Sequence, residues 1–140
     1  MATDTNLGFK YEGRLSGQPD LWADFTFKDT ETLTKGDLVN LESGEVDLAA
    51  TGDSAFAGVV AETLSGTDST TKIKVFYAPD ALFSVYDANA RAAGATLDIS
   101  GATGAMTVAA TSNADLIVVK ESTASERTLV MFNGGHYLQV

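Results

Sequence analysis

The sequence has no cysteine, 2 prolines, one histidine and only 9 lysines and arginines against 19 aspartates and glutamates in 140 residues. Without cysteine there can be no disulfide, thiolate zinc site or thiol nucleophile. The net charge of −10 opposes binding to a phosphate backbone or an anionic lipid surface. No apolar run approaches the roughly 20 residues that span a bilayer, and no basic region followed by an apolar one opens the chain. We therefore expect a soluble, unexported protein without nucleic-acid or membrane partners.

Groups suited to chemistry are also scarce. The only imidazole, His136, follows two glycines near the C-terminal end, a position more typical of a turn than of a general base. No serine lies in a Gly-x-Ser-x-Gly elbow, and no Gly-x-x-x-x-Gly-Lys phosphate loop occurs. The acidic residues lack the spacing of a calcium loop. We therefore expect no enzyme activity, no catalytic residues, no metal, no cofactor and no small-molecule substrate, and the role of His136 stays open.

The residues that are present predict a mainly β protein. Hydrophobic residues make up 44% of the chain, and short apolar runs alternate with clusters rich in Gly, Asp, Ser and Thr. This pattern is typical of many short antiparallel strands joined by turns, in a small β-sandwich or β-barrel. The expected strands span 21–27, 38–41, 46–48, 57–64, 73–77, 82–86, 97–99, 106–108, 116–119, 129–132 and 137–140.

Local signals refine this map. Gly44 and the turn 101–104 each predict a hairpin. One short stretch, 87–93, fits either a short helix with Asp87 as its N-cap or an irregular loop, so at most one helix is expected. The continuous apolar runs 116–119 and 129–132 favour strands that are buried on both faces.

The chain resembles itself at a shift of about 56 to 59 residues. Residues 34–78 and 92–134 both contain a glycine, a strand, a glycine turn, a second strand, an Ala-Ala pair and two further strands, in the same order. Two similar β-modules packed together would explain this echo, and so would the general likeness of small-residue β sequences. Residues 1–20 lie outside it, which predicts an extended N-terminal arm before a single compact domain over 21–140.

The arm supplies the candidate partner-binding residues. Leu7, Phe9 and Tyr11 alternate with polar residues and have no local partner for burial, so the segment could add a strand to a neighbouring sheet edge. Leu15 follows in the arm, and Trp22 falls on the otherwise polar face of the strand at 21–27. The alternative interpretation of the arm is a disordered terminus.

Several motifs resemble those of capsid decoration proteins, the head cement or head-stabilising proteins of tailed bacteriophages. The resemblance covers about residues 34 to 132 and rests on the segments 35–39, 44–46, 49–50, 56–60, 93–97 and 104–108. The second half departs from the first, since Gly94-Ala95 stands where the first half has Gly36-Asp37, and it has no counterpart of Gly58.

The resemblance implies a β-rich virion protein on the capsid exterior, assembled in the host cytoplasm. Such a protein stabilises the shell by bridging subunits of the major capsid protein, usually as a homotrimer. Two other functions remain open from the residues alone. One is another virion subunit of a tail tube or head fibre. The other is a carbohydrate or cell-surface binding module that uses exposed aromatic residues.

Overall fold

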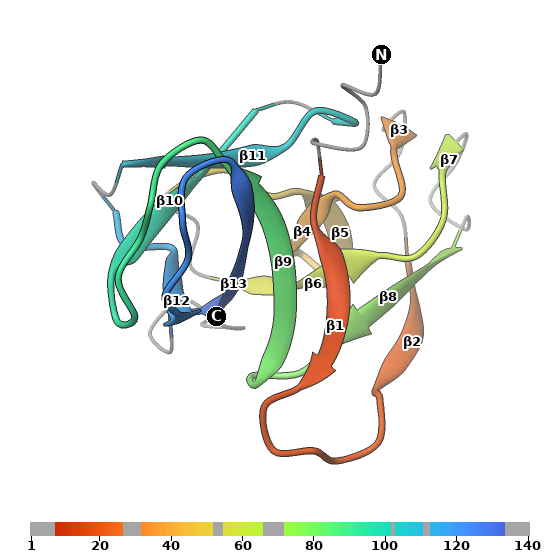
Figure 1. The fold of residues 1–140 in the computed structure, drawn as a ribbon. Coiled ribbons are helices and arrows are strands. Elements are labelled where there is room, and N and C mark those ends of the chain that lie inside the picture. Colours follow the sequence, from red (N-terminus) through yellow and green to blue (C-terminus); the bar gives the residue numbers. More distant parts are fainter. Residues whose placement is uncertain are drawn as a thin grey trace.

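The computed structural model describes residues 8–26, 32–51, 55–65, 72–101, 103–110 and 113–133. Every regular element in these ranges is a β-strand, as the sequence predicts (Figure 1). The strands are β1 (Lys10–Arg14), β2 (Trp22–Thr26), β3 (Thr32–Leu33), β4 (Leu38–Glu42), β5 (Glu45–Leu48), β6 (Phe56–Val60), β7 (Leu64–Ser65), β8 (Lys72–Tyr77), β9 (Ala81–Asp87), β10 (Thr96–Ser100), β11 (Thr107–Ala110), β12 (Leu116–Lys120) and β13 (Glu126–Phe132).

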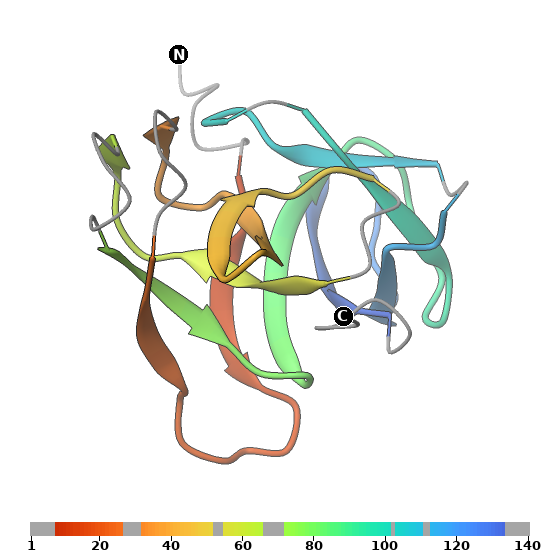
Figure 2. The same ribbon diagram turned by 180° about the vertical axis from the view of Figure 1, so that it is seen from behind.

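The strands form two main antiparallel sheets that pack as a small β-sandwich without closing into a barrel. One sheet has six strands in the order β1-β9-β13-β12-β10-β11, and the other has five in the order β2-β8-β6-β4-β5. Strands β3 and β7 form a separate two-stranded ribbon. Figures 1 and 2 show the two sheets from opposite sides, with β1 and β2 joined by a loop that projects from one end of the molecule.

Both predicted hairpins are present. In the β4–β5 hairpin, Ser43 and Gly44 have φ values of 53° and 81°. Positive φ at both central residues defines the type I′ turn, whose twist matches that of the flanking strands. The second hairpin joins β10 to β11 with Ile99 opposite Val108.

The structure favours the loop alternative over the helix at 87–93. Asp87 ends β9, and its carboxylate accepts hydrogen bonds from the Arg91 guanidinium and the Asn89 backbone N–H. Arg91 then exchanges two backbone hydrogen bonds with Ser122. Because the backbone of Arg91 is bound across to another strand, it cannot take part in a helical turn here.

Two burial predictions are wrong. In β12 and β13 the apolar run does not mean burial on both faces, since buried Leu116 and Val118 alternate with partly exposed Ile117 and Val119. Leu21, which the alternation places on a buried face, is 36% exposed because it precedes the start of β2. The predicted strand at 137–140 lies outside the described residues.

The first described residues also differ from the expected arm. Lys10–Arg14 pairs with β9 as the edge strand of the six-stranded sheet. Phe9 is 4% exposed in the main core, and its backbone N–H donates to the carbonyl oxygen of Gly36 at 2.8 Å. The alternating apolar residues therefore mark a strand of the domain itself. Residues 1–7 lie outside the described residues.

The two sheets repeat one strand order. The strands β8-β6-β4-β5 of one sheet correspond to β13-β12-β10-β11 of the other, and β2 and β9 occupy the next position in each. Backbone hydrogen bonds recur 58 residues apart: Gly36 to Val60 and Gly94 to Val118. The pairing of Leu33 with Leu64 likewise corresponds to that of Arg91 with Ser122. Most of these positions lie in the two stretches that echo each other in sequence, 34–78 and 92–134, and Leu33 and Arg91 immediately precede them.

Side chains confirm the same correspondence at a turn. The Asn40 side-chain oxygen accepts a hydrogen bond from the backbone N–H of Ala55 at 3.1 Å. At the matching positions, the Asp98 carboxylate accepts one from the Asn113 N–H at 2.9 Å. In each repeat, a polar side chain on the inner strand thus fixes the loop that leads into the next strand.

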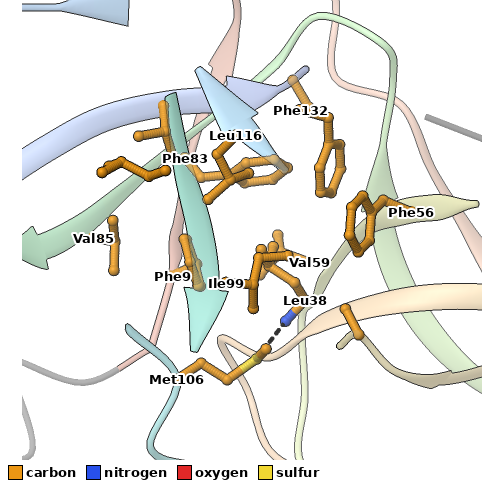
Figure 3. Packing of buried hydrophobic residues seen from close by; sticks show 14 of the residues in the cluster. Phe9, Leu38, Phe56, Val59, Phe83, Val85, Ile99, Met106, Leu116 and Phe132 are labelled. Atoms are coloured by element: carbon orange, nitrogen blue, oxygen red, sulfur yellow. Dashed lines mark hydrogen bonds between the residues drawn. The ribbon is translucent and has the colours of Figure 1, made fainter. Parts of the chain in front are cut away.

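The main hydrophobic core fills the space between the two sheets. Phe56 and Phe132 stack with ring centroids 5.2 Å apart, and Phe83 meets Phe132 edge-on (Figure 3). Beneath them, the backbone N–H of Leu38 lies 3.1 Å from the sulfur of Met106, so the first repeat contacts the second hairpin directly. A second cluster lies on the other face of the five-stranded sheet and contains Leu33, Val39, Val46, Ala57, Val60, Ile73 and Val75.

A buried carboxylate joins the two sheets at their turns. Asp37 is fully buried and accepts hydrogen bonds from the Thr34 N–H and the Gly104 N–H, both at 2.9 Å, and from the Thr103 hydroxyl. Thr34 precedes β4, whereas Thr103 and Gly104 form the turn between β10 and β11. Asp37 therefore stabilises its own turn and binds the turn of the other sheet.

We predict that Asp37→Ala lowers the free energy of unfolding by about 2–3 kcal/mol, because hydrogen bonds to a charged group are lost and buried donors lose their acceptor. Thermal and urea denaturation measure the change. Asp24→Ala is the matched control, since Asp24 is exposed on β2, and it should stay within about 0.5 kcal/mol of wild type. Equal stability of the two variants would show that the Asp37 bonds contribute nothing net.

Candidate binding surface

Three large hydrophobic side chains are exposed in the described residues, and all three lie at one end of the molecule. Leu15 is 55% exposed, Trp22 53% and Leu21 36%. Leu15 and Leu21 begin and end the β1–β2 loop (residues 15–21), and Trp22 follows as the first residue of β2. The loop projects beyond both sheets (Figures 1 and 2). Solvent-exposed apolar groups gathered on a loop are typical of a surface that a partner covers.

The β1–β2 loop is held in place at both ends. The backbone N–H of Leu15 donates to the carbonyl oxygen of Asp80, and the carbonyl of Leu21 accepts from the N–H of Tyr77. The Asp80 carboxylate also accepts hydrogen bonds from the Ser16 N–H at 3.1 Å and from the Arg14 side chain at 2.8 Å. The bonds from Ser16, together with Arg14, lower the pKa of Asp80 to about 2. The backbone that carries the exposed side chains is thus held by hydrogen bonds at both ends of the loop.

A ladder of rings and a cation runs inward from this loop. The ammonium nitrogen of Lys74 lies 4.4 Å from the ring centroid of Trp22 and 5.2 Å from that of Phe76. The Phe76 ring in turn stacks on Tyr11, with centroids 4.5 Å apart and planes within 5° of parallel. Because Tyr11 is on β1 and Phe76 on β8, this stack joins the two sheets next to the exposed loop.

The ladder ends in a groove of about 790 Å³. We call it the basic groove, because its lining includes four of the nine lysines and arginines and none of the acidic residues. Its lining residues are Gly8, Phe9, Lys10, Tyr11, Lys35, Gly36, Val59, Val60, Ala61, Lys74, Phe76 and Arg127. The groove therefore combines apolar and aromatic lining residues with cationic side chains in a protein of strongly negative net charge.

The Arg127 side chain is fixed at one wall of the basic groove. Its guanidinium donates to the carbonyl oxygens of Ser84 at 2.7 Å and Gly8 at 3.3 Å. Burial lowers the pKa of Arg127, and the nearby Glu12 carboxylate opposes that shift. Glu12 itself accepts a hydrogen bond from the Ser84 hydroxyl. The guanidinium thus connects β13, β9 and the start of β1.

The five residues predicted to bind a partner occupy different environments. Leu15 and Trp22 are exposed at the projecting loop, and their role in binding a partner stays a prediction. Tyr11 is partly buried against Phe76, at the edge of the basic groove. Phe9 has no local partner for burial, as expected, but its side chain is buried in the main core against residues distant in the sequence. Leu7 lies outside the described residues, as does His136.

Sequence reasoning missed Leu21 and most of the basic groove. Lys74 lies within the strand expected at 73–77, but the neighbouring residues in the sequence do not mark it as part of a groove. Lys10 and Arg127 come together through the pairing of β1 with β9 and of β9 with β13. Lys35 joins them through the hydrogen bond from the Phe9 N–H to the carbonyl oxygen of its neighbour Gly36. No linear motif could have revealed them.

The buried carboxylates serve the fold. Asp98 accepts hydrogen bonds from two backbone N–H groups, and Asp115 from the Ile99 N–H and the Thr51 hydroxyl. Over the described ranges, no group of three or more His, Cys, Asp or Glu side chains is placed to hold a metal ion, and no helix is long and apolar enough to cross a membrane.

Comparison with known proteins gives a fold likeness. No family model matches the sequence, and no curated protein matches it. Among solved structures, the chain is similar to the head fibre gp8.5 N base of bacteriophage phi29, with a TM-score of 0.52 and 16% sequence identity. The match covers 83% of this chain and 98% of the phi29 chain. At this identity, the likeness shows a shared fold.

Tyr11 gives a spectroscopic test of this surface. Desolvation by burial and the hydrogen bond from its hydroxyl to Asp20 raise its pKa from 10.0 to about 12. Since the folded pKa lies above the unfolded one, the associated stability is present below pH 10 and is lost as the pH rises through 12. We predict that Tyr11→Phe removes a phenol that titrates near pH 12 in phenolate absorbance and abolishes this alkaline loss of stability. An unchanged titration curve would contradict the packing of Tyr11 described here.

Proposed function

We propose that this protein is a structural subunit of a tailed-bacteriophage head that binds the outer surface of the capsid. The observation that carries the proposal is the fold shared with a phage head-fibre base, which extends over nearly all of the phi29 chain. The resemblance of residues 34 to 132 to capsid decoration proteins supports the same location. Both point to a virion component outside the shell.

The projecting β1–β2 loop is the surface that we assign to the capsid. Leu15, Leu21 and Trp22 are the large hydrophobic side chains that the described part of the chain leaves in solvent. The bonds to Asp80 keep the loop backbone ordered before binding, which reduces the entropy lost on association. A small apolar contact of this kind becomes effective when many copies bind a symmetric shell.

Two forms of this function differ in their consequence for the shell. A cement protein, as the sequence resemblance implies, bridges subunits of the major capsid protein as a homotrimer and stabilises the shell. A fibre base, which the fold likeness favours, attaches a projecting structure without strengthening the shell. Heating of capsids with and without bound protein separates the two forms, since only cement raises the temperature at which capsids rupture.

We also propose that the role is purely structural, without catalysis or a cofactor. The support is the use of the buried carboxylates, because Asp37, Asp87, Asp98 and Asp115 each accept hydrogen bonds that fix turns or strands. Because these carboxylates accept hydrogen bonds that hold the fold, we assign them a structural role. Binding surfaces remain as the means by which the protein acts.

We predict that Leu15→Ser combined with Trp22→Ser weakens binding to expanded, undecorated capsids by roughly thirtyfold or more, since a buried tryptophan at an interface contributes about 2 kcal/mol or more. Co-sedimentation over a range of protein concentrations gives the affinity and the number of copies per capsid. The melting temperature should stay near that of wild type, because both side chains are exposed.

Lys120→Ser is the control, because it shortens an exposed side chain on β12, and it should bind as wild type does. Absence of saturable capsid binding by the wild-type protein would overturn the proposed function. Unchanged binding by the double variant would remove the β1–β2 loop from it.

A further inference from the structure

We propose that the basic groove is a docking site for a second copy of this chain, which inserts the acidic tip of its β4–β5 hairpin. The acidic tip comprises the turn residues Glu42–Glu45 together with Asp47. This inference concerns contacts between copies and does not depend on capsid binding.

The basic groove carries positive charge that the described residues do not neutralise with ion pairs at Lys10 or Lys35, both of which are exposed. Lys74 rests on the rings of Trp22 and Phe76. The Glu12 carboxylate lies near Arg127 and accepts a hydrogen bond from the Ser84 hydroxyl, whereas Glu62 accepts one from the backbone N–H of Lys74. An occupant that supplies carboxylates would lower the repulsion between these cations.

The acidic tip brings like negative charges close together. Glu42 and Glu45 are directly opposite each other across the hairpin, and Asp47 lies in the same short strand as Glu45. Like charges facing each other across a strand pair are destabilising. No lysine or arginine in the described ranges forms an ion pair with Glu42 or Glu45. Electrostatic repulsion that a sequence retains at a tight turn is typical of a functional site, here a binding element.

The fold places the two surfaces at opposite ends of one strand. Lys35 and Gly36, which line the basic groove, precede β4, and Glu42 ends it. At about 3.3 Å per residue, roughly 20 Å separates them, so the tip of one molecule cannot reach its own groove. It can reach the groove of a neighbour. A contact between two different surfaces joins copies head to tail, in a ring if the rotation closes and in a filament if it does not.

The size of the groove also fits the shape of the acidic tip. The type I′ turn at Ser43 and Gly44 makes the hairpin end narrow, and a volume of about 790 Å³ accommodates several residues. The groove is lined by lysines together with the rings of Phe9, Tyr11 and Phe76.

Charge reversal tests the proposal with purified protein. Sedimentation equilibrium of the wild-type protein should show self-association at low salt that weakens steeply as salt is added. Lys10→Glu with Lys35→Glu reverses the charge at two positions of the basic groove, and Glu42→Lys with Glu45→Lys reverses the charge at two positions of the acidic tip. Each reversed protein alone should associate roughly a hundredfold more weakly than wild type. An equimolar mixture of the two should associate again, because each then offers the other a complementary partner.

Matched controls separate a specific contact from net charge. Lys72→Glu with Lys120→Glu changes the net charge as much as the groove reversal, at exposed residues outside the groove, and Glu121→Lys with Glu126→Lys matches the tip reversal. Both controls should associate as wild type does, and circular dichroism should show that all variants are folded.

A wild-type protein that stays monomeric at low salt, reversed proteins that associate normally, or a mixture that fails to associate would each overturn the proposal. Loss of capsid binding by the groove reversal with self-association unchanged would also overturn it, and would assign the groove to the capsid instead. Salt-dependent self-association without any capsid binding would support this inference and overturn only the proposed function.

Discussion

The carboxylate of Asp37 is the interaction on which the arrangement of the two sheets depends. It lies in the turn before β4 and binds the turn between β10 and β11 through Thr103 and Gly104. The adjacent Gly36 accepts the backbone N–H of Phe9 and thereby fixes the start of β1. One turn therefore positions the opposite sheet, the edge strand and the entrance of the basic groove. A change there would alter the fold and the groove together.

The repeat explains why this turn is distinctive. The backbone hydrogen bonds around Gly36 recur around Gly94, but Ala95 stands where the first repeat has Asp37. The second repeat also has Ala93 in place of Lys35. Gly58 differs as well, because a side chain there would meet the backbone of Phe76 at 1.8 Å, whereas Leu116 occupies the matching position in the main core. The repeats share backbone pairing and diverge where the first contacts the second sheet and lines the groove.

The sequence predicts the parts of the fold that short-range signals determine. Gly44 indicates the first hairpin, and alternation in β8 indicates its buried face. The role of β1 could not be predicted, because alternating Phe9 and Tyr11 fit a free arm and an edge strand equally well, and only the pairing with β9 decides between them. The exposure of Trp22 follows from alternation alone. The basic groove depends on Lys10 and Arg127, from opposite ends of the chain, and so on tertiary structure.

The two surfaces are suited to different parts of binding. Leu15, Leu21 and Trp22 can exclude water on contact, which supplies affinity but little orientation, because apolar contact is not directional. The cations of the basic groove act over a longer range and reject partners of the same sign, which sets orientation and specificity. Lys74 belongs to both, since it rests on Trp22 and lines the groove. Events at the apolar loop and at the groove are therefore physically connected, and substitutions at Trp22 and Lys74 should not act independently.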